Sequence, residues 1–327
     1  MAKRKKKNKV RIPWLFVLAA ALVLSAAALI TLREYFSLPS FIPSWKDVGD
    51  KVESLTEKIS SDYDLPISGS AKTLSVHFVD VGQGDSILLQ CSGKNALIDA
   101  GDKKAGVNLI AYLKNQGVER LDTVFITHPD ADHIGGMAQV IDALEIGEVV
   151  MGEFPEELTP TTQTYTDLLL TIARKGTKMR LAKAGDRFTV GETQLQAVAP
   201  TTGFDSLNNC SLGLRAVYGE TSFLFTGDME KQSEKATILE GYDLQSDVLK
   251  VGHHGAKTST SEEFLKAVSP RIAVISCGVD NRYGHPTSVV LERLEAIGAK
   301  VYRTDLAGTV VIVSDGKELE VSETGKK

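Results

Sequence analysis

Two histidines and two aspartates fall within six residues of this chain, in the stretch Thr-His-Pro-Asp-Ala-Asp-His-Ile-Gly-Gly at 127–136. An apolar, strand-like run at 121–126 leads into the stretch, and a helix-like segment at 137–144 follows it. Crowding such groups costs free energy unless a cation offsets their repulsion and desolvation. Imidazole nitrogens and carboxylate oxygens suit zinc, manganese or iron. We therefore expect a divalent metal site here rather than a solvated charged loop.

The same stretch carries a family resemblance. The pattern His-x-Asp-x-Asp-His at 128–133 is similar to the His-x-His-x-Asp-His signature of the metallo-β-lactamase superfamily, with Asp130 where a histidine is usual. This aspartate form resembles the hydrolase domain of the ComEC-type competence proteins, which take up DNA. Four more of their motifs occur in the same order: Val-Asp-Val-Gly-Gln-Gly-Asp-Ser at 79–86, Phe-Thr-Gly-Asp at 225–228, Val-Gly-His-His-Gly at 251–255 and Tyr-Gly-His-Pro at 283–286.

From residue 73 onward, strand-like and helix-like segments alternate. We expect strands at 74–81, 86–90, 95–99, 121–126, 187–190, 194–199, 212–218, 222–226, 248–251, 272–276, 300–302 and 309–313. We expect helices at 107–115, 137–144, 164–174, 230–239, 261–268 and 288–296. This mixture favours an α/β domain of two packed sheets with helices outside. The four-layer αββα sandwich in particular is what the resemblance, which covers about residues 74–321, implies.

The N-terminus reads as a membrane anchor. Residues 1–11 carry seven Lys and Arg and form the expected basic cytoplasmic tail, and residues 12–32 are apolar, uncharged and long enough to span a bilayer as one transmembrane helix. The basic flank should stay in the cytoplasm, which places the rest of the chain outside the cell membrane. Small residues at 25–28 leave a cleaved signal peptide and secretion as the alternative. We favour the uncleaved anchor, because the apolar run continues past them.

Residues 33–72 read as a stalk or linker, since they contain three prolines and too few periodic apolar positions for a core. Residues 73–327 form the expected hydrolase domain. Twelve of the 37 basic and seven of the 42 acidic residues precede residue 73, so this domain has a net charge near −10. Such a charge is not that of a general nucleic-acid coat protein. The three cysteines are widely spaced and form no disulfide framework.

The resemblance implies two divalent metal ions and a set of ligands. These are His128 and Asp130 for one ion, Asp132 and His133 for the other, Asp228 as the carboxylate shared by both, and His253 as the last histidine. His254 competes with His253, which we prefer. Because Asp130 replaces a nitrogen by an oxygen donor, the balance moves from zinc towards manganese or magnesium.

One ligand of the family pattern is missing. The superfamily usually supplies a histidine about twenty residues before the shared aspartate, where this chain reads Asn-Asn-Cys-Ser at 208–211. Asn209 or Ser211 could donate an oxygen, water could take the place, or Cys210 could bind zinc. Asp80 and Asp85 flank a glycine-bounded turn that lets backbone approach the metals. Either could hold a ligand histidine in place, and ordinary turn chemistry is the alternative.

Asp132 and His285 are the candidate catalytic residues. His285 lies before a helix-like segment and could hydrogen-bond a phosphate oxygen or protonate a leaving group. Thr258 and Ser259 are small donors before another helix start, which suits an anion, with helix capping as the alternative.

Together these features predict a membrane-anchored, extracytoplasmic, metal-dependent hydrolase. A phosphodiesterase or nuclease acting on DNA is the preferred reading, and DNA as the substrate follows from the resemblance alone. The alternatives are hydrolysis of another phosphodiester or of a lactam, and a non-catalytic metal-binding module of the same fold.

Overall fold

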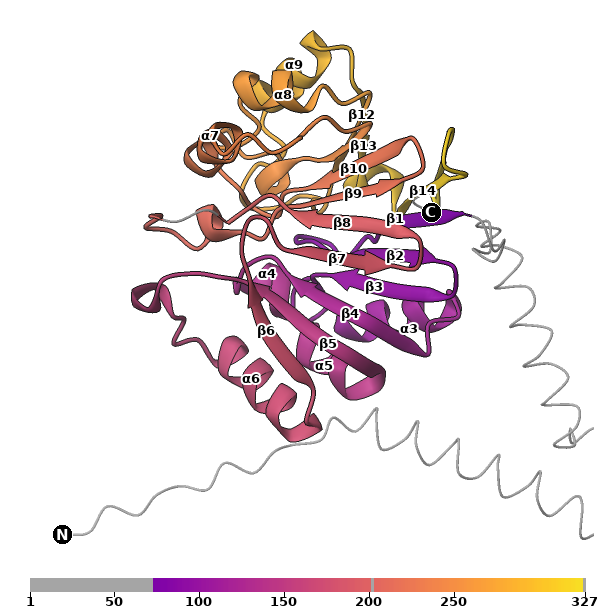
Figure 1. Cartoon of the computed structure of the whole chain (residues 1–327), viewed down its shortest axis with the longest axis vertical. Coiled ribbons are helices and arrows are strands. Elements are labelled where there is room, and N and C mark those ends of the chain that lie inside the picture. Colours follow the sequence, from indigo (N-terminus) through magenta and orange to yellow (C-terminus); the bar gives the residue numbers. More distant parts are fainter. Residues whose placement is uncertain (1–72, 201–202, 326–327) are drawn as a thin grey trace, which may run out of the picture. The chain divides into compact units, whose positions relative to one another are not determined.

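The computed structural model describes residues 73–200 and 203–325, whose strands form two sheets (Figure 1). The first sheet has the order β15-β14-β1-β2-β3-β4-β5-β6. Its strands are β1 (Leu74–Phe78), β2 (Ile87–Cys91), β3 (Lys94–Ile98), β4 (Arg120–Ile126), β5 (Glu145–Gly152), β6 (Lys178–Ala182), β14 (Val310–Ser314) and β15 (Leu319–Glu323). The second has the order β13-β12-β11-β10-β9-β8-β7. Its strands are β7 (Arg187–Val190), β8 (Thr193–Ala197), β9 (Leu214–Tyr218), β10 (Thr221–Phe225), β11 (Val248–Lys250), β12 (Ile272–Ile275) and β13 (Lys300–Arg303).

Helices cover the outer face of each sheet (Figure 1). Beside the first sheet lie α3 (Gly106–Asn115), α4 (Ala131–Ile134), α5 (Met137–Ala143) and α6 (Gln163–Lys175). Beside the second lie α7 (Lys231–Leu239), α8 (Glu262–Val268) and α9 (Ser288–Ala296). Short helical turns complete the described chain: η1 (Glu156–Leu158), η2 (Asn208–Cys210), η3 (Gly252–Gly255) and α10 (Thr304–Ala307).

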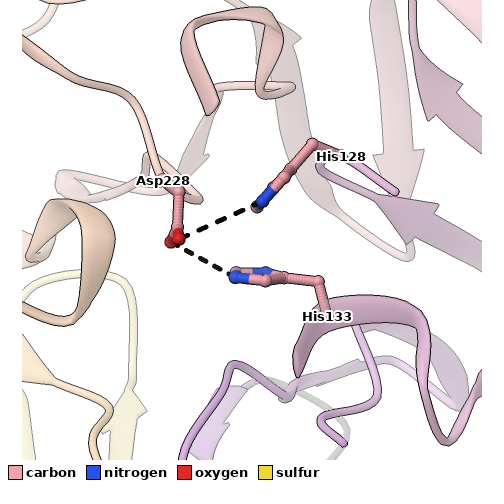
Figure 2. A group of neighbouring side chains, drawn as sticks. All are labelled: His128, His133 and Asp228. Atoms are coloured by element: carbon pink, nitrogen blue, oxygen red, sulfur yellow. Dashed lines mark ion pairs between the residues drawn. The ribbon is translucent and has the colours of Figure 1, made fainter. Parts of the chain in front are cut away.

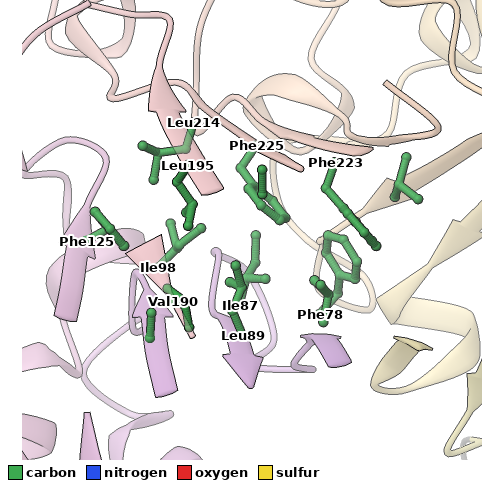
Figure 3. Packing of buried hydrophobic residues seen from close by; sticks show 14 of the residues in the cluster. Phe78, Ile87, Leu89, Ile98, Phe125, Val190, Leu195, Leu214, Phe223 and Phe225 are labelled. Atoms are coloured by element: carbon green, nitrogen blue, oxygen red, sulfur yellow. The ribbon is translucent and has the colours of Figure 1, made fainter. Parts of the chain in front are cut away.

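Three hydrophobic clusters separate these layers. The middle cluster lies between the sheets and includes Phe78, Phe125, Phe223 and Phe225 (Figure 3). A second cluster fills the space between the first sheet and α3, α5 and α6, and a third lies between the second sheet and α8 and α9. Both sheets therefore bury both faces, which explains their near-continuous apolar strands. The α/β prediction of two packed sheets is confirmed, and its layers follow the order αββα.

Each sheet contains an antiparallel and a parallel part. In the first, β1, β2 and β3 pair antiparallel, whereas β3 to β6 run parallel. In the second, β7 to β10 pair antiparallel and β10 to β13 run parallel. Parallel strands bring their carboxyl ends, and the loops after them, to one edge of a sheet. Four of the five motifs singled out in the sequence follow β4, β10, β11 and β12, all of which belong to these parallel parts, and the fifth, at 79–86, connects the antiparallel strands β1 and β2.

Three strands were missed from the sequence: β5, β6 and β15. Strands β6 and β15 close the two ends of the first sheet and expose much of their length, so their residues lack the apolar pattern of a buried strand. The first half of β5 is partly exposed and contains two glutamates and a glycine. Pattern analysis depends on burial, and these strands gain their stability from pairing with a neighbour instead.

The predicted tail, anchor and stalk lie outside the described residues, at 1–72. Within 73–200 and 203–325, no helix combines the length and apolar character needed to cross a bilayer. The anchor at 12–32 and the position outside the cell therefore stay predictions.

Candidate metal centre

The candidate ligands come from loops that follow three parallel strands. His128 lies two residues beyond the end of β4, and Asp228 lies three residues beyond the end of β10. His253 and His254 follow β11 within the turn η3. Figure 2 shows that His128, His133 and Asp228, although far apart in the sequence, point toward one another.

Close backbone packing holds the loop of the motif in place. Gly84 has a φ of +127°, and a Cβ atom there would lie 2.1 Å from the carbonyl oxygen of Asp132. The amide of Asp85 donates to that same carbonyl oxygen at 3.2 Å. The glycine turn at 82–84 therefore supports the metal loop through backbone contact that a side chain would prevent.

Three buried imidazoles converge on Asp228. The Nε2 atom of His133 lies 3.2 Å from Asp228 Oδ1, and those of His128 and His254 lie 4.0 and 3.5 Å from Asp228 Oδ2. None of these nitrogens, nor Asp228 Oδ1, makes a hydrogen bond to any described residue. Buried polar atoms without partners are uncommon in proteins. A divalent ion among them would satisfy all four, so the cluster suits divalent metals.

Two of the possible ligand groups match two neighbouring sites. One contains His128, His133 and Asp228, and the other contains Asp132, His133 and His254. The Nε2 atom of His254 lies 3.3 Å from Asp132 Oδ2. Asp130 approaches from the His128 side, with its Oδ2 atom 3.6 Å from His128 Nε2. The chain thus brings together every aspartate and histidine of the 128–133 motif.

The two histidines of η3 turn in different directions. Both have positive φ angles, 47° for His253 and 53° for His254. The ring of His254 is buried, whereas that of His253 is 23% exposed and lies between Glu230, at 3.2 Å, and Asp228, at 3.6 Å. The groups of three ligand atoms found among the described residues contain His254 and not His253. Geometry therefore favours His254 as the ligand, the reverse of the preference drawn from the sequence.

Carboxylates and carbonyls hold His133 and His254 from behind. The Nδ1 atom of His133 lies 2.8 Å from Asp99 Oδ2, and Asp99 also accepts hydrogen bonds from the amide and hydroxyl of Thr127. His254 Nδ1 faces the carbonyl of Ser276 at 2.9 Å. Such partners fix the ring orientation and leave Nε2 for the metal.

A buried ion pair lies behind His254. Lys250 Nζ is 2.6 Å from Asp85 Oδ2, and Asp85 Oδ1 is 3.3 Å from His254 Nδ1. Lys250 is 0% and Asp85 1% exposed. Burial alone would raise the pKa of Asp85, but the charges of Lys250 and His254 outweigh it and lower that pKa. Lys250 was missed from the sequence, although a lysine closing the apolar strand Val-Leu-Lys before the paired histidines was the available signal.

Hydroxyls alone support His128. Its Nδ1 atom lies 3.1 Å from Thr127 Oγ1 and 3.3 Å from Ser211 Oγ, which also accepts from the amide of Asp228. Asn209 is used elsewhere, because its Oδ1 atom accepts from Ser233 N in α7. Burial raises the pKa of the Cys210 thiol, which disfavours a thiolate ligand. Ser211 is thus the residue of the 208–211 segment that contacts a metal-facing side chain.

The comparisons with known proteins agree with this arrangement. The family model described as "Metallo-beta-lactamase superfamily" matches residues 79–279. The chain belongs to the metallo-β-lactamase superfamily. The YhfI protein of Bacillus subtilis, a solved metallo-β-lactamase fold, superposes with a TM-score of 0.50 at 13% identity, covering 74% of this chain and 100% of that one, which supports the fold.

Two curated relatives within the superfamily are competence proteins. ComE operon protein 3 of Bacillus subtilis is 33% identical over 255 residues, which cover 72% of this chain and 32% of that protein. Competence protein ComA of Neisseria gonorrhoeae is 33% identical over 235 residues, covering 71% and 31%. The resemblance to ComEC-type competence proteins is thereby confirmed, and the chain spans about a third of the length of these relatives.

His285 lies at the open side of the centre. Its ring is 5.5 Å from that of His253, edge to face, and it stacks on Tyr283 at 5.8 Å. The Nδ1 atom is buried and has no partner among the described residues. Burial, followed by the nearby imidazoles of His253 and His254, lowers the pKa of His285. A lowered pKa makes the protonated ring a stronger acid, so His285 can give a proton to a bound substrate.

Three of the other predicted residues make hydrogen bonds within the loops around the site. Thr258 donates its hydroxyl to Glu230 at 2.6 Å, and Ser259 donates to the carbonyl of Gly252 at 2.7 Å. Asp80 accepts from the amide of Gly82, which is ordinary turn chemistry. Thr258 thus joins its loop to the start of α7, whereas Ser259 bonds within its own loop.

The field of the centre favours positive charge. Burial raises the pKa of Asp228, but the nearby histidines His254 and His133 reverse this and hold it well below its usual value. Burial opposes the charged form of His254, yet Asp228, Asp132 and Asp85 raise its pKa to about 10. The same carboxylates attract a metal ion, which would take the place of these protons.

Proposed function

We propose that the chain is a metal-dependent phosphodiesterase that acts on DNA and is held outside the cell by an anchor at 12–32. Metal-dependent hydrolysis, the most general part of this proposal, rests on membership of a superfamily whose members are generally metal-dependent hydrolases. The observation that carries the catalytic part is the convergence of three unpartnered Nε2 atoms on Asp228. A centre kept only for its fold has no need of such atoms, because each unpaired buried group costs about 1–3 kcal/mol.

Each residue has a role in this reaction. His128 and Asp130 would hold one ion, Asp132, His133 and His254 the other, and Asp228 would face both. Two such ions supply an activated water and positive charge opposite the scissile phosphate. His285 would give a proton to the leaving oxygen from the open side. The hydrogen bonds of His133 with Asp99 and of His254 with the Ser276 carbonyl would keep the ligand rings aligned.

DNA is proposed from the relatives. They include proteins named for competence and, in Haemophilus influenzae, "Recombination protein 2", which is 31% identical over 266 residues. Since the chain spans about a third of their length, their whole activity does not transfer to it. Because Asp130 makes its half of the centre richer in oxygen, manganese should support activity at least as well as zinc.

One set of assays separates this function from its alternatives. The full chain, purified in detergent, is analysed for bound metal and then offered linear single- and double-stranded DNA, RNA, a nitrophenyl phosphodiester and a lactam. We expect two metal equivalents and the highest kcat/KM on DNA. Preference for the lactam or for RNA would overturn the proposed substrate, and bound metal without turnover on any of these compounds would favour the non-catalytic metal-binding module.

The anchor is tested separately. Protease added to intact cells should digest the domain beyond residue 72, because the basic tail at 1–11 is expected inside. Digestion that occurs only after lysis would place the domain in the cytoplasm.

A further inference from the structure

A shallow depression of about 550 Å³ adjoins the open side of the metal centre. Its lining includes Glu230, Lys231, Lys257, Thr258 and Arg293, which come from the start of α7, the loop after η3, and α9. Glu230 lies 3.2 Å from His253, which lies 3.6 Å from Asp228. The imidazole ring of His253 therefore lies between Glu230, in the wall of the depression, and the carboxylate of Asp228 in the metal centre.

The charged groups of this depression are mostly cationic. Lys231 and Lys257 are exposed, and neither forms an ion pair within 73–200 and 203–325. Arg293 donates Nη1 to the carbonyls of Ser259 and Thr260, which fixes its guanidinium, and its charge also acts on the buried carboxyl of Glu234, whose pKa burial raises. Glu230 is the carboxylate of the lining, and its Oε1 atom already faces His253 and Thr258.

Two lysines that have no ion pair in the described part of the chain line the same depression as a fixed arginine, on a domain whose net charge is near −10. They repel one another unless an anion joins them, and two exposed lysines beside a fixed arginine can surround a phosphate from several sides. The depression also opens next to the place where a scissile phosphate would lie. A small ester or a lactam held at the metals would not reach it, whereas the next phosphates of a polymer would.

We propose that Lys231, Lys257 and Arg293 form a phosphate-binding subsite, here called the lysine pocket, for a flanking segment of a polymeric phosphodiester. The proposal rests on the proposed phosphodiesterase function and narrows its substrate to a polyanionic strand that extends past the bond being cleaved. The pocket contributes binding rather than chemistry, so its loss should raise KM for the polymer and leave a small phosphodiester unaffected.

The test compares two charge-matched variants of the full chain. Lys231→Gln/Lys257→Gln removes two cations of the pocket. Lys114→Gln/Lys178→Gln removes two exposed cations from α3 and β6, in the other half of the sandwich. Each protein is assayed on a single-stranded oligonucleotide and on a nitrophenyl phosphodiester across a salt series. Binding of a labelled oligonucleotide is measured separately by anisotropy in the presence of a chelator.

For single-stranded nucleic acid, each phosphate contact contributes about −0.7 to the slope of log binding constant against log salt concentration. Losing two contacts should therefore weaken binding of the oligonucleotide by about 25-fold at 0.1 M salt. We expect this loss in oligonucleotide binding and KM for the pocket variant alone, with unchanged rates on the nitrophenyl ester. Equal losses in both variants, or none, would overturn the lysine pocket. If the wild type hydrolyses no phosphodiester but the pocket variant still loses binding, the proposed function fails and the subsite stands.

Discussion

The two halves of the metal centre are built differently. Around His133 and His254 the second ring nitrogens face Asp99, a backbone carbonyl and Asp85. Around His128 the supports are the hydroxyls of Thr127 and Ser211. We call these the braced half and the open half.

The difference predicts unequal roles. Charged acceptors make stronger hydrogen bonds than hydroxyls and raise the basicity of the ring they hold. In the open half, Asp130 has a side chain that is 46% exposed, and its second oxygen remains available to solvent or substrate. The braced half should therefore bind its ion tightly, and the open half should bind more weakly and meet the substrate.

The largest effect should come from Asp228→Ala, because this carboxylate belongs to both halves. The variant should lose both metal equivalents, and activity should fall by more than the 10- to 100-fold that supporting residues cost. Metal analysis of the purified protein and rates on a nitrophenyl phosphodiester check this. Retention of one tight ion would show that the braced half does not depend on Asp228.

His285→Ala tests whether this histidine, which lies beside His253, takes part in the chemistry. The metal content should stay the same, while the rate on nucleotide esters should fall by about 10²- to 10⁴-fold, the usual worth of general acid–base catalysis. The loss should be smaller on a nitrophenyl ester, whose leaving group needs little protonation. An equal loss on both esters would exclude leaving-group protonation, and a lost metal equivalent would make His285 a ligand.

Lys250→Met tests the support of the braced half. Breaking a buried ion pair leaves Asp85 charged and unpaired, which costs about 3–5 kcal/mol of the free energy of unfolding. The exposed pair Lys94–Asp122, at 3.0 Å, is the matched control, and Lys94→Met should cost less than about 1 kcal/mol. Urea unfolding of both variants measures the contrast. Similar losses would mean that Lys250 contributes packing rather than charge.

Lys250 also illustrates which site residues could not be predicted from the sequence. The 128–133 motif and Asp228 could be predicted, because ligand types at short spacing follow strand ends that the apolar pattern locates. The choice between His253 and His254 could not, since it depends on two successive positive φ angles in η3. The contact between Asp99 and His133 could not be predicted either, because it joins residues 34 positions apart.

The same limit applies to the fold. Buried strands such as β1 and β10 were found because all of their residues are apolar or buried. The edge strands β6 and β15 were missed because pairing, not burial, defines them. The roles of Thr258 and Ser259 depend on partners that no local pattern indicates, Glu230 for the first and the carbonyl of Gly252 for the second.

Asp130→His tests whether the oxygen donor of Asp130 sets the metal preference of the open half. Replacing an oxygen donor by imidazole should move the ratio of zinc to manganese affinity towards zinc, on the order of tenfold or more, since a direct ligand matters at least as much as a supporting one. Chelated protein is titrated with each ion and assayed on a phosphodiester. Activity of the unaltered chain with zinc alone would contradict the reasoning from donor type.

The smallest effect should come from Ser211→Ala, which separates a support from a ligand. If Ser211 only holds His128, the variant loses a neutral hydrogen bond worth about 0.5–1.5 kcal/mol, or about 2- to 12-fold in affinity for the weaker ion. The tight ion of the braced half should be unchanged. Calorimetric titration resolves the two ions, and Asn209→Ala, whose side chain contacts α7 rather than His128, is the neighbouring control. A loss above about 100-fold, confined to Ser211→Ala, would instead identify its hydroxyl as the missing ligand.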